Sequence, residues 1–464
     1  MDGQGAHLLL ITYPAQGHIS PLLQFGKRIV AKGIKATLVI TKFIQKTTHL
    51  ENDLPMSVET ISDGYDDGWR NSGDSMEAYF SNLKSLSSQQ ILDVIEKLSS
   101  SDNPVSGIVY DAFMPWFVEV AKQCSVLSLI FFTQSCAVNS IYYHVQRGKI
   151  PVPVSKNAID LPGLPSLDAS DAPSFVSEKE YHVYPSICNM VIQQLVGIED
   201  VDWVLFNIFY DLEPETVEWM AKQWRVATIG PTLPASYLDK RLVGDKTYGL
   251  SMFNANPACM SWLHDKPQNS VVYVSFGSMA ILGEEQMAEL AWGLKLTSFY
   301  YVWVVRETEM AKLPSNYANE LGDKGLIVNW CSQLDVLAHE AIGCFVTHCG
   351  FNSVLEAISL GVPMVGMPQW TDQPTNAKFV KDVWKVGVRT RAEENGVVRS
   401  EAVAGCVREV MEGERGKEIR DNAMKLSELA KKAVATGGSS DKCMDEVVAS
   451  VVRHSTSQLQ STRF

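Results

Sequence analysis

Two distant stretches of the sequence share one pattern: an apolar run that ends in a turn, a helical pattern and a second apolar run. The two sets of predicted strand, helix and strand cover 7–14, 22–30 and 35–40, and again 270–278, 287–294 and 300–306. Continuous apolar strands that alternate with helices are typical of parallel sheets covered by helices on both faces. The sequence therefore predicts an α/β fold with two such sheets.

The length and the spacing of these patterns predict the domain organisation. A chain of 464 residues is too long for one compact core and is typical of two or three domains. We predict two facing Rossmann-like domains, over 1–232 and 257–439. The stretch 230–249 holds two prolines, mixed charge and little periodicity, as interdomain linkers do, and we predict the linker over 233–256. A last helix, over 440–454, is predicted to pack back on the N-terminal domain.

Composition and charge exclude several classes of protein. Apolar residues make up 46% of the chain and charged residues 20%, an ordinary globular balance. The net charge of -13 argues against nucleic-acid binding, which needs a basic face. The nine cysteines form no CxxC pair, which favours a reducing compartment. There is no signal-peptide pattern and no apolar run near the roughly 20 residues of a membrane span, so we expect a cytoplasmic location. We also expect a monomer.

The most informative segment is 330–373. It contains a predicted strand over 344–348, a glycine turn and a helix from about Ser353. Gly350 at the corner allows close approach of a ligand to the backbone. The helix start offers unpaired N–H groups and the positive end of a dipole, a geometry that binds a pyrophosphate. His348 at the end of the strand could add a hydrogen bond to the same phosphates.

This segment, WCSQLDVLAHEAIGCFVTHCGFNSVLEAISLGVPMVGMPQWTDQ, resembles the signature box of the plant family 1 UDP-dependent glycosyltransferases. The elements PAQGH (14–18), YD…PW (110–116) and SFGS (275–278) extend the resemblance over nearly the full chain. It implies the two-domain GT-B fold, with UDP-sugar bound by the C-terminal domain and the acceptor by the N-terminal domain. Phe351 stands where the family usually has Trp, and Phe can substitute if the position supplies packing and a backbone N–H.

The resemblance also implies which residues bind the donor. These are Trp330 with the backbone of Cys331 or Ser332 for uracil, Gln333 and Glu356 for ribose, Ser278, His348, Asn352 and Ser353 beside Gly350 for the phosphates, and Thr133, Trp370, Asp372 and Gln373 for the sugar. A final glutamine goes with glucose in this family, so Gln373 favours UDP-glucose. Taken alone, Ser353 and Glu356 would also fit a capping box at a helix start. Trp330 alone would also fit an ordinary core tryptophan.

The residues for catalysis are predicted in the N-terminal domain. An attacking hydroxyl must lose its proton, and a histidine with a pKa near neutrality suits that role. His18 follows the first strand, where loops face the crevice of an open α/β sheet. Asp111 follows the apolar run 106–110 and could accept the second imidazole N–H. Taken alone, His18 could also be a residue at the start of a helix, and Asp111 could also be a helix cap. The resemblance implies a dyad in which His18 is the general base of an inverting transfer.

A metal cofactor is not expected. Many sugar transferases bind a divalent cation through a DxD motif, and this chain contains Asp200-Val201-Asp202. The motif precedes the apolar run 203–206, which favours a turn between a helix and a strand. The helix N-terminus and His348 could carry the charge of the leaving UDP instead.

The acceptor pocket is predicted in loops of the first domain. An apolar cleft with few polar groups is the usual form of such a pocket, although each candidate also fits an ordinary core residue. The candidates are Tyr79, Phe113, Met114, Trp116, Ser135 and Tyr142. The sequence around YDAFMPW and TQSCAVNS is similar to the sequences of the family branch that acts on steroids, triterpenoids, salicylate and thiohydroximates. It favours a steroid, triterpenoid or phenolic hydroxyl, with glucose esters and thioglucosides as alternative products.

Other functional classes remain open from the sequence. A UDP-sugar epimerase of the two-domain type would convert UDP-glucose without an acceptor. A binding protein that has lost catalysis would not need both His18 and Asp111. A NAD-linked dehydrogenase is disfavoured, because neither glycine turn spells GxGxxG with a following acidic residue.

Overall fold

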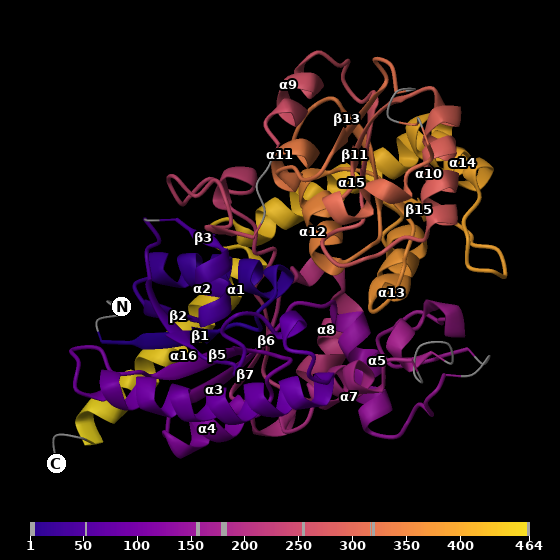
Figure 1. Ribbon diagram of the computed structural model, residues 1–464. Coiled ribbons are helices and arrows are strands. Elements are labelled where there is room, and N and C mark those ends of the chain that lie inside the picture. Colours follow the sequence, from indigo (N-terminus) through magenta and orange to yellow (C-terminus); the bar gives the residue numbers. More distant parts are fainter. Residues whose placement is uncertain are drawn as a thin grey trace. The chain divides into compact units, whose positions relative to one another are not determined.

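The computed structural model describes residues 5–51, 53–154, 158–177, 183–252, 256–315, 317 and 321–461 (Figure 1). The chain forms two compact units. Unit 1 comprises Met1–Ser166, Phe175–Met252 and Lys431–Phe464, and unit 2 comprises Leu167–Ser174 and Phe253–Ala430. Each unit is built on one parallel sheet, which confirms the predicted fold class.

The sheet of unit 1 has seven strands in the order β4-β2-β1-β5-β6-β7-β8, all parallel. They are β1 (His7–Ile11), β2 (Lys35–Thr41), β4 (Ser57–Ile61), β5 (Gly107–Asp111), β6 (Leu127–Phe132), β7 (Trp203–Phe206) and β8 (Val226–Thr228); β3 (His49–Leu50) and β9 (Leu250–Ser251) form a separate antiparallel pair. All residues of β1, β5 and β7 are buried, as expected of strands covered on both faces.

The direction of strand addition in unit 1 reverses between β1 and β5. Right-handed crossovers therefore place α1 on one face of the sheet and α3 and α4 on the other. The helices are α1 (Gln16–Ala31), α2 (Lys42–Thr47), α3 (Met76–Ser99), α4 (Phe117–Gln123), α5 (Cys136–Gln146), α7 (Pro185–Gln193), α8 (Pro214–Ala221) and α16 (Ser439–Ser461), with 3-10 turns η1 (Trp69–Asn71), η4 (Ile198–Asp200), η5 (Tyr210–Leu212) and η6 (Ala235–Tyr237). Ligands of such sheets bind where the strand order reverses, at the carboxyl ends of the strands.

The C-terminal helix α16, yellow in Figure 1, packs on the indigo N-terminal elements of unit 1. Its Met444, Val447 and Val451 belong to the same core cluster as the apolar residues of β1 and α1. The helix continues to Ser461, past the predicted end at residue 454. Near that end the Ser455 hydroxyl donates to the carbonyl of Gly5 at 3.0 Å, a tertiary contact that the sequence pattern does not contain.

The segment after β8 packs on unit 1 as far as Met252, although we predicted a linker from residue 233. Lys27 of α1 lies 2.7 Å from Asp245 in this segment, and both side chains are buried. The other oxygen of Asp245 accepts the backbone N–H of Ala235 at 2.7 Å. These contacts give an apparently irregular stretch a fixed position.

The sheet of unit 2 has six parallel strands in the order β12-β11-β10-β13-β14-β15. They are β10 (Val271–Ser275), β11 (Tyr300–Val304), β12 (Gly325–Val328), β13 (Ile342–Thr347), β14 (Met364–Gly366) and β15 (Gly387–Arg389). The order reverses between β10 and β13, so this sheet has its own switch point there.

Helices cover both faces of this second sheet. They are α9 (Ala258–His264), α10 (Glu284–Thr297), α11 (Gln333–Leu337), α12 (Phe351–Leu360), α13 (Gln373–Lys378), α14 (Ser400–Met411) and α15 (Gly413–Val434), with 3-10 turns η2 (Ala169–Asp171) and η7 (Glu307–Lys312) and a π turn η9 (Phe379–Val383). Helices α10 and α14 share one core cluster through Leu290, Val403 and Val407. Because α12 follows β13, on the other side of the switch point from β10, it covers the face of the sheet opposite to α10 and α14.

The short segment Leu167–Ser174 packs with unit 2, although the residues on both sides of it in the sequence belong to unit 1. Asp171 lies 2.7 Å from Arg389 at the end of β15, and its carbonyl accepts the hydroxyl of Thr375 at 2.6 Å. The composition of this segment did not predict that it packs with unit 2.

Candidate functional site

A histidine and a carboxylate meet at the switch point of unit 1. His18 lies in the first turn of α1 and Asp111 is the last residue of β5. Nδ1 of His18 lies 2.6 Å from Oδ2 of Asp111, whose other oxygen accepts the backbone N–H of Phe113 at 2.9 Å. The side chain of Asp111 is only 2% exposed and that of His18 is 16% exposed. An ionised Asp111 accepts the Nδ1–H, so the neutral ring has its lone pair on Nε2.

Two aromatic rings and a hydroxyl surround the imidazole. The ring centroids of Tyr13 and Phe113 lie 5.2 Å and 4.7 Å from that of His18. The hydroxyl of Thr133, just after β6, lies 3.5 Å from Nδ1. Burial and the nearby charge of Asp111 raise the pKa of Tyr13, so its hydroxyl stays protonated at neutral pH. We had not singled out Tyr13, although its place after the first strand, within YPAQGH, was an available signal.

The structure brings only some of the acceptor candidates to His18. Phe113 contacts it. Tyr79 neighbours Tyr13 rather than His18 itself, and burial together with the nearby Tyr13 and Asp63 raises the pKa of Tyr79. The other candidates have positions inside unit 1: Met114 and Tyr142 are fully buried, Trp116 packs on Phe117 with ring centroids 5.9 Å apart, and Ser135 accepts the N–H of Val138 at 3.3 Å as the N-cap of α5.

The switch point of unit 2 is built around His348. A Cβ at Gly277 would lie 2.9 Å from the His348 ring, and one at Gly350 would lie 2.5 Å from its Nε2. Gly277 also has a φ of +69°, which side chains disfavour. The two glycines therefore leave the space that the ring needs beside the start of α12. That helix begins at Phe351, two residues before the predicted start, and Phe351 is 3% exposed and supplies core packing.

His348 is a neutral residue at physiological pH. Burial lowers its pKa to about 4, despite a backbone hydrogen bond to Ser275. Its Nδ1 is a buried atom without a hydrogen-bond partner among the described residues. The neutral imidazole has a single N–H and brings no full positive charge to a bound anion.

A polar cluster links α11 to α12. The amide of Gln333 donates to Ser353 Oγ at 2.9 Å and to Glu356 Oε2 at 2.7 Å, and its oxygen accepts the hydroxyl of Tyr273 at 3.2 Å. Ser353 and Glu356 both lie inside α12, whose N-cap is Gly350, so the alternative of a capping box is wrong. The fold thus gathers three of the predicted donor contacts and adds Tyr273, which we had not singled out.

The loop after β14 is held by the residues predicted to contact the sugar. The side-chain oxygen of Gln373 accepts the backbone N–H of Trp370 at 3.0 Å and of the preceding residue at 2.9 Å. Asp372 accepts the amide of Asn376 at 2.7 Å, and the same amide donates to the carbonyl of Cys349 at 3.0 Å. These bonds join the loop after β14 to the loop after β13.

The other donor candidates lie at the same carboxyl edge of the sheet. Trp330, half-buried, precedes α11, and its carbonyl accepts the N–H of Asn256 at 2.9 Å. Cys331 is buried, with its sulfur 3.4 Å from the hydroxyl of Tyr273. The remaining three are Ser332 as the N-cap residue of α11, Ser278 in the turn after β10 and Asn352 in the first turn of α12.

Comparison with known proteins places the chain that carries these two sites in one family. Residues 93–435 match the family model described as UDP-glucoronosyl and UDP-glucosyl transferase. The chain belongs to the UDP-glycosyltransferase family. It is 50% identical to UDP-glycosyltransferase 74E2 of Arabidopsis thaliana over 96% of this chain and 99% of that protein. It is 46% identical to mogroside I-E synthase of Siraitia grosvenorii over 97% of this chain and 99% of that protein.

A solved structure supports the same assignment. Os79 from O. sativa, in complex with UDP, superposes with a TM-score of 0.90 at 39% identity, covering 96% of this chain and 100% of that one. A second structure of Os79 contains U2F and trichothecene. The two parallel-sheet units are thus those of the GT-B fold that the resemblance implied.

The DxD sequence of this UDP-glycosyltransferase lies in the predicted turn, from the last residue of η4 to the residue before β7. Asp200 pairs with Lys122 at 3.0 Å, and Asp202 accepts the backbone N–H and the hydroxyl of Ser128 at 2.8 Å and 2.9 Å. In the described ranges, no group of three or more His, Cys, Asp or Glu side chains could hold a metal ion. Over those same ranges, no helix has the length and apolar character of a membrane span.

The low pKa of His348 predicts an acid-sensitive stability. The unfolded chain protonates this residue near pH 6.5 and the folded chain only near pH 4, so the free energy of unfolding falls as the pH drops between these values. We expect a loss of up to about 3 kcal/mol from this group. Urea titrations at pH 7 and pH 4.5 measure it: His348→Gln should lose less stability than the wild type over this interval. An equal loss in both proteins would contradict the assignment.

Proposed function

We propose that this UDP-glycosyltransferase transfers glucose from UDP-glucose to a hydroxyl of a small lipophilic acceptor, with inversion, to give a β-O-glucoside. The observation that carries the proposal is the 2.6 Å contact between His18 Nδ1 and the buried Asp111 at the switch point of unit 1. A buried carboxylate that orients an imidazole is the arrangement needed for a general base, with Asp111 stabilising the imidazolium that forms.

The proposed reaction begins with the acceptor hydroxyl at Nε2 of His18. Nε2 takes the hydroxyl proton while the acceptor oxygen bonds to the anomeric carbon, on the face opposite UDP. The bond from that carbon to the β-phosphate oxygen breaks, and its electron pair leaves with UDP. Because attack and departure occur on opposite faces, an α-linked donor gives a β-linked product. The proton remains on His18 and is lost to solvent after release.

Unit 2 is proposed to bind UDP-glucose at its switch point. Backbone N–H groups at the start of α12 would donate hydrogen bonds to the diphosphate, and the neutral His348 ring is proposed as a further contact of the phosphates. The other proposed contacts in unit 2 are Trp330 with the backbone of Cys331 or Ser332 for uracil, Gln333 and Glu356 for ribose, Ser278, Asn352 and Ser353 for the phosphates, and Trp370, Asp372 and Gln373 for glucose. Thr133 of unit 1 is proposed as a further glucose contact.

The reaction is proposed to need no metal ion. Asp200 and Asp202 already pair with Lys122 and Ser128, which supports a structural role for the DxD sequence. We expect an initial rate within about twofold of the untreated value after dialysis against EDTA, measured as UDP release. A sharp loss that Mg²⁺ or Mn²⁺ restores would return both aspartates to the reaction.

The acceptor is proposed to be a bulky terpenoid or steroid alcohol. Two relatives support this choice: one is named for a mogroside, a triterpenoid glycoside, and Os79 was solved with trichothecene. The aromatic rings of Tyr13 and Phe113 beside His18 suit an apolar skeleton with one hydroxyl at the base. Esters and thioglucosides remain alternative products.

The acceptor test is a panel of triterpenes, steroids, phenols, aromatic acids and thiols with UDP-glucose, read by mass. The proposal expects the highest kcat/KM with a terpenoid or steroid alcohol and an alkali-stable glucoside product. An alkali-labile product or preference for the acids would assign ester formation instead. UDP-glucose incubated without acceptor should remain unchanged, because its conversion to another UDP-sugar would identify an epimerase.

The two ends of the Gln373 amide permit a sharper test of the donor assignment. Its oxygen holds the backbone at Trp370, so only its NH₂ group is proposed to reach the sugar. Gln373→Glu retains the acceptor oxygen and removes the NH₂ donor, whereas Gln373→Ala removes both. We expect Gln373→Glu to raise the KM for UDP-glucose about tenfold with an unchanged Kd for UDP. Unchanged donor kinetics would remove the sugar contact and leave Gln373 a loop residue.

A further inference from the structure

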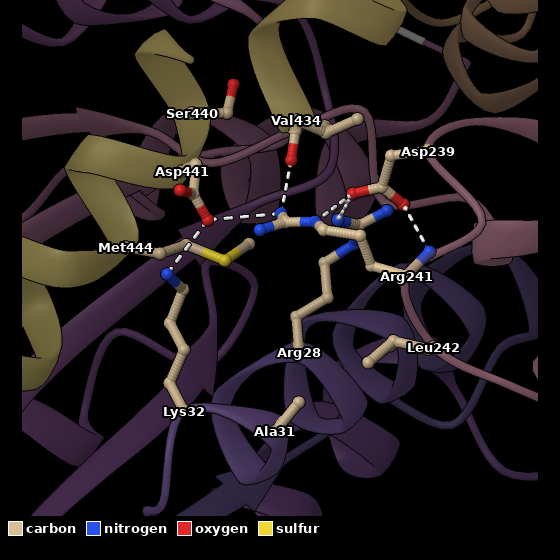
Figure 2. Close-up of a pocket in the computed structure, with 10 residues that line it drawn as sticks. All are labelled: Arg28, Ala31, Lys32, Asp239, Arg241, Leu242, Val434, Ser440, Asp441 and Met444. Carbon is tan, nitrogen blue, oxygen red and sulfur yellow. Dashed lines mark hydrogen bonds and ion pairs between the residues drawn. The ribbon is translucent and has the colours of Figure 1, made fainter. Parts of the chain in front are cut away.

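The cavity in Figure 2, of about 210 Å³, is a junction of paired charges in unit 1. Asp441 lies 2.8 Å from Lys32 and 3.1 Å from Arg241, and Asp239 lies 2.5 Å from Arg241. These contacts join the end of α1 to the start of α16 and compensate the charges within the cavity. A second group of charges, around Asp171 in unit 2, lies beside the loop that carries the proposed glucose contacts.

Asp171 anchors the segment Leu167–Ser174 on unit 2. Its carboxylate lies 2.7 Å from the guanidinium of Arg389, the last residue of β15. Its carbonyl accepts the hydroxyl of Thr375, in α13, at 2.6 Å. Asp171 is 5% exposed, so solvent screens the ion pair only weakly. These contacts fix the position of Ser174, the last residue of the segment.

Ser174 binds both backbone polar groups of Thr371, in the loop after β14. Its N–H donates to the carbonyl of Thr371 at 2.8 Å, and its Oγ accepts the N–H of Thr371 at 2.6 Å. The two residues are 197 positions apart in the sequence. Ser174 is 8% exposed, and a buried N–H that lost this acceptor would be left without compensation.

The backbone of Thr371 has a conformation that needs such support. Its φ is +57°, in the left-handed region that β-branched residues disfavour. A residue keeps a conformation of this kind only where its surroundings hold it. Thr371 lies between Trp370 and Asp372, two of the proposed glucose contacts, so its backbone angles decide where both side chains point. The two bonds from Ser174 therefore act on the geometry of the proposed sugar site.

The neighbouring N–H groups of this loop are bound from within it. Oε1 of Gln373 accepts the N–H of Gln369 at 2.9 Å and that of Trp370 at 3.0 Å. Oγ1 of Thr371 accepts the N–H of Asp372 at 2.5 Å. Of the four consecutive N–H groups from Gln369 to Asp372, the central one of Thr371 is thus bound from outside the loop, by Ser174.

We propose that Ser174 is a positioning residue for the donor sugar: by holding Thr371, it orients Trp370 and Asp372 toward the glucose of UDP-glucose. This inference rests on the proposed function, in which this loop contacts glucose. Uracil and the diphosphate are proposed to bind at α11 and at the start of α12. Loss of the Ser174 hydroxyl should therefore weaken recognition of the sugar and spare the binding of UDP.

The test compares the Kd for UDP-glucose with the Kd for UDP, both measured by calorimetry without an acceptor. Ser174→Ala removes the acceptor of the Thr371 N–H. We expect it to raise the Kd for UDP-glucose about fivefold to tenfold, with the Kd for UDP within about twofold of the wild type. Ser174→Thr retains the hydroxyl and should restore the wild-type ratio of the two constants. An equal rise in both constants would overturn the inference, because Ser174 would then support only the fold.

Ser427→Ala is the matched control. Ser427 is a buried serine of unit 2, 1% exposed, whose hydroxyl donates to the carbonyl of Ser359 at 2.7 Å. Its loss should lower the Tm and leave the ratio of the two Kd values unchanged. Gln373→Glu then separates this inference from the proposed function. If Gln373→Glu raises the ratio and Ser174→Ala does not, only the inference is wrong; if neither variant raises it, the loop does not bind glucose and both are wrong.

Discussion

His18→Ala is expected to lower kcat about 10³-fold with a hydroxyl acceptor, while the Kd for UDP stays within about twofold of the wild type. The reason is that Nε2 is the proposed acceptor of the hydroxyl proton, whereas the proposed UDP contacts all belong to unit 2. Without the imidazole, the alcohol must attack while still protonated. Steady-state kinetics with UDP-glucose and titration of UDP measure the two quantities separately.

The acceptor itself provides an internal control for the role of His18. A phenol of low pKa is already partly ionised, so the loss in His18→Ala should shrink as the acceptor pKa falls and as the pH rises. If His18 only supported the fold, His18→Ala would lower kcat by the same factor with every acceptor. His49→Ala, an exposed histidine on β3, should keep the wild-type kcat. Near-normal turnover by His18→Ala would remove the general-base assignment.

The sequence predicted the sheets well because buried parallel strands are continuous apolar runs. The predicted strand at 35–40 is β2 at Lys35–Thr41, and that at 300–306 is β11 at Tyr300–Val304. Local sequence signals failed to predict the ends of helices that tertiary structure determines. Helix α12 begins at Phe351, and its N-cap Gly350 has no side chain to mark the start. Helix α16 runs past the predicted end, where the Ser455 hydroxyl donates to the carbonyl of Gly5.

The proximity of candidate residues was predictable only where the topology dictates it. His18 and Asp111 follow strands at a switch point, so their contact follows from the α/β pattern and the resemblance together. The cluster of Gln333 with Glu356 and Tyr273 needs the packing of α11 against α12 and β10. The ion pair of Asp171 with Arg389 joins segments that share no pattern, so no local property could have indicated it.

Asp111→Asn is the second change expected to have a large effect, with kcat about 10²- to 10³-fold lower and the fold retained. The ionised carboxylate accepts the Nδ1–H of His18 and keeps the lone pair on Nε2. An amide at this position can instead donate its N–H to Nδ1, which places the proton on Nε2 and removes the base. The N–H of Phe113 still finds an acceptor in the amide oxygen, so stability changes little. Kinetics and urea unfolding of this variant measure both effects.

The double variant separates positioning by Asp111 from an independent role. If Asp111 acts only through His18, then adding Asp111→Asn to His18→Ala costs little further activity, because the imidazole that it orients is gone. Additive losses would show that Asp111 acts on the reaction by another route. Full activity in Asp111→Asn alone would mean that the 2.6 Å contact merely fixes the loop after β5. The strongly non-additive result is expected, since the buried carboxylate contacts the ring and the backbone of its own loop rather than open space.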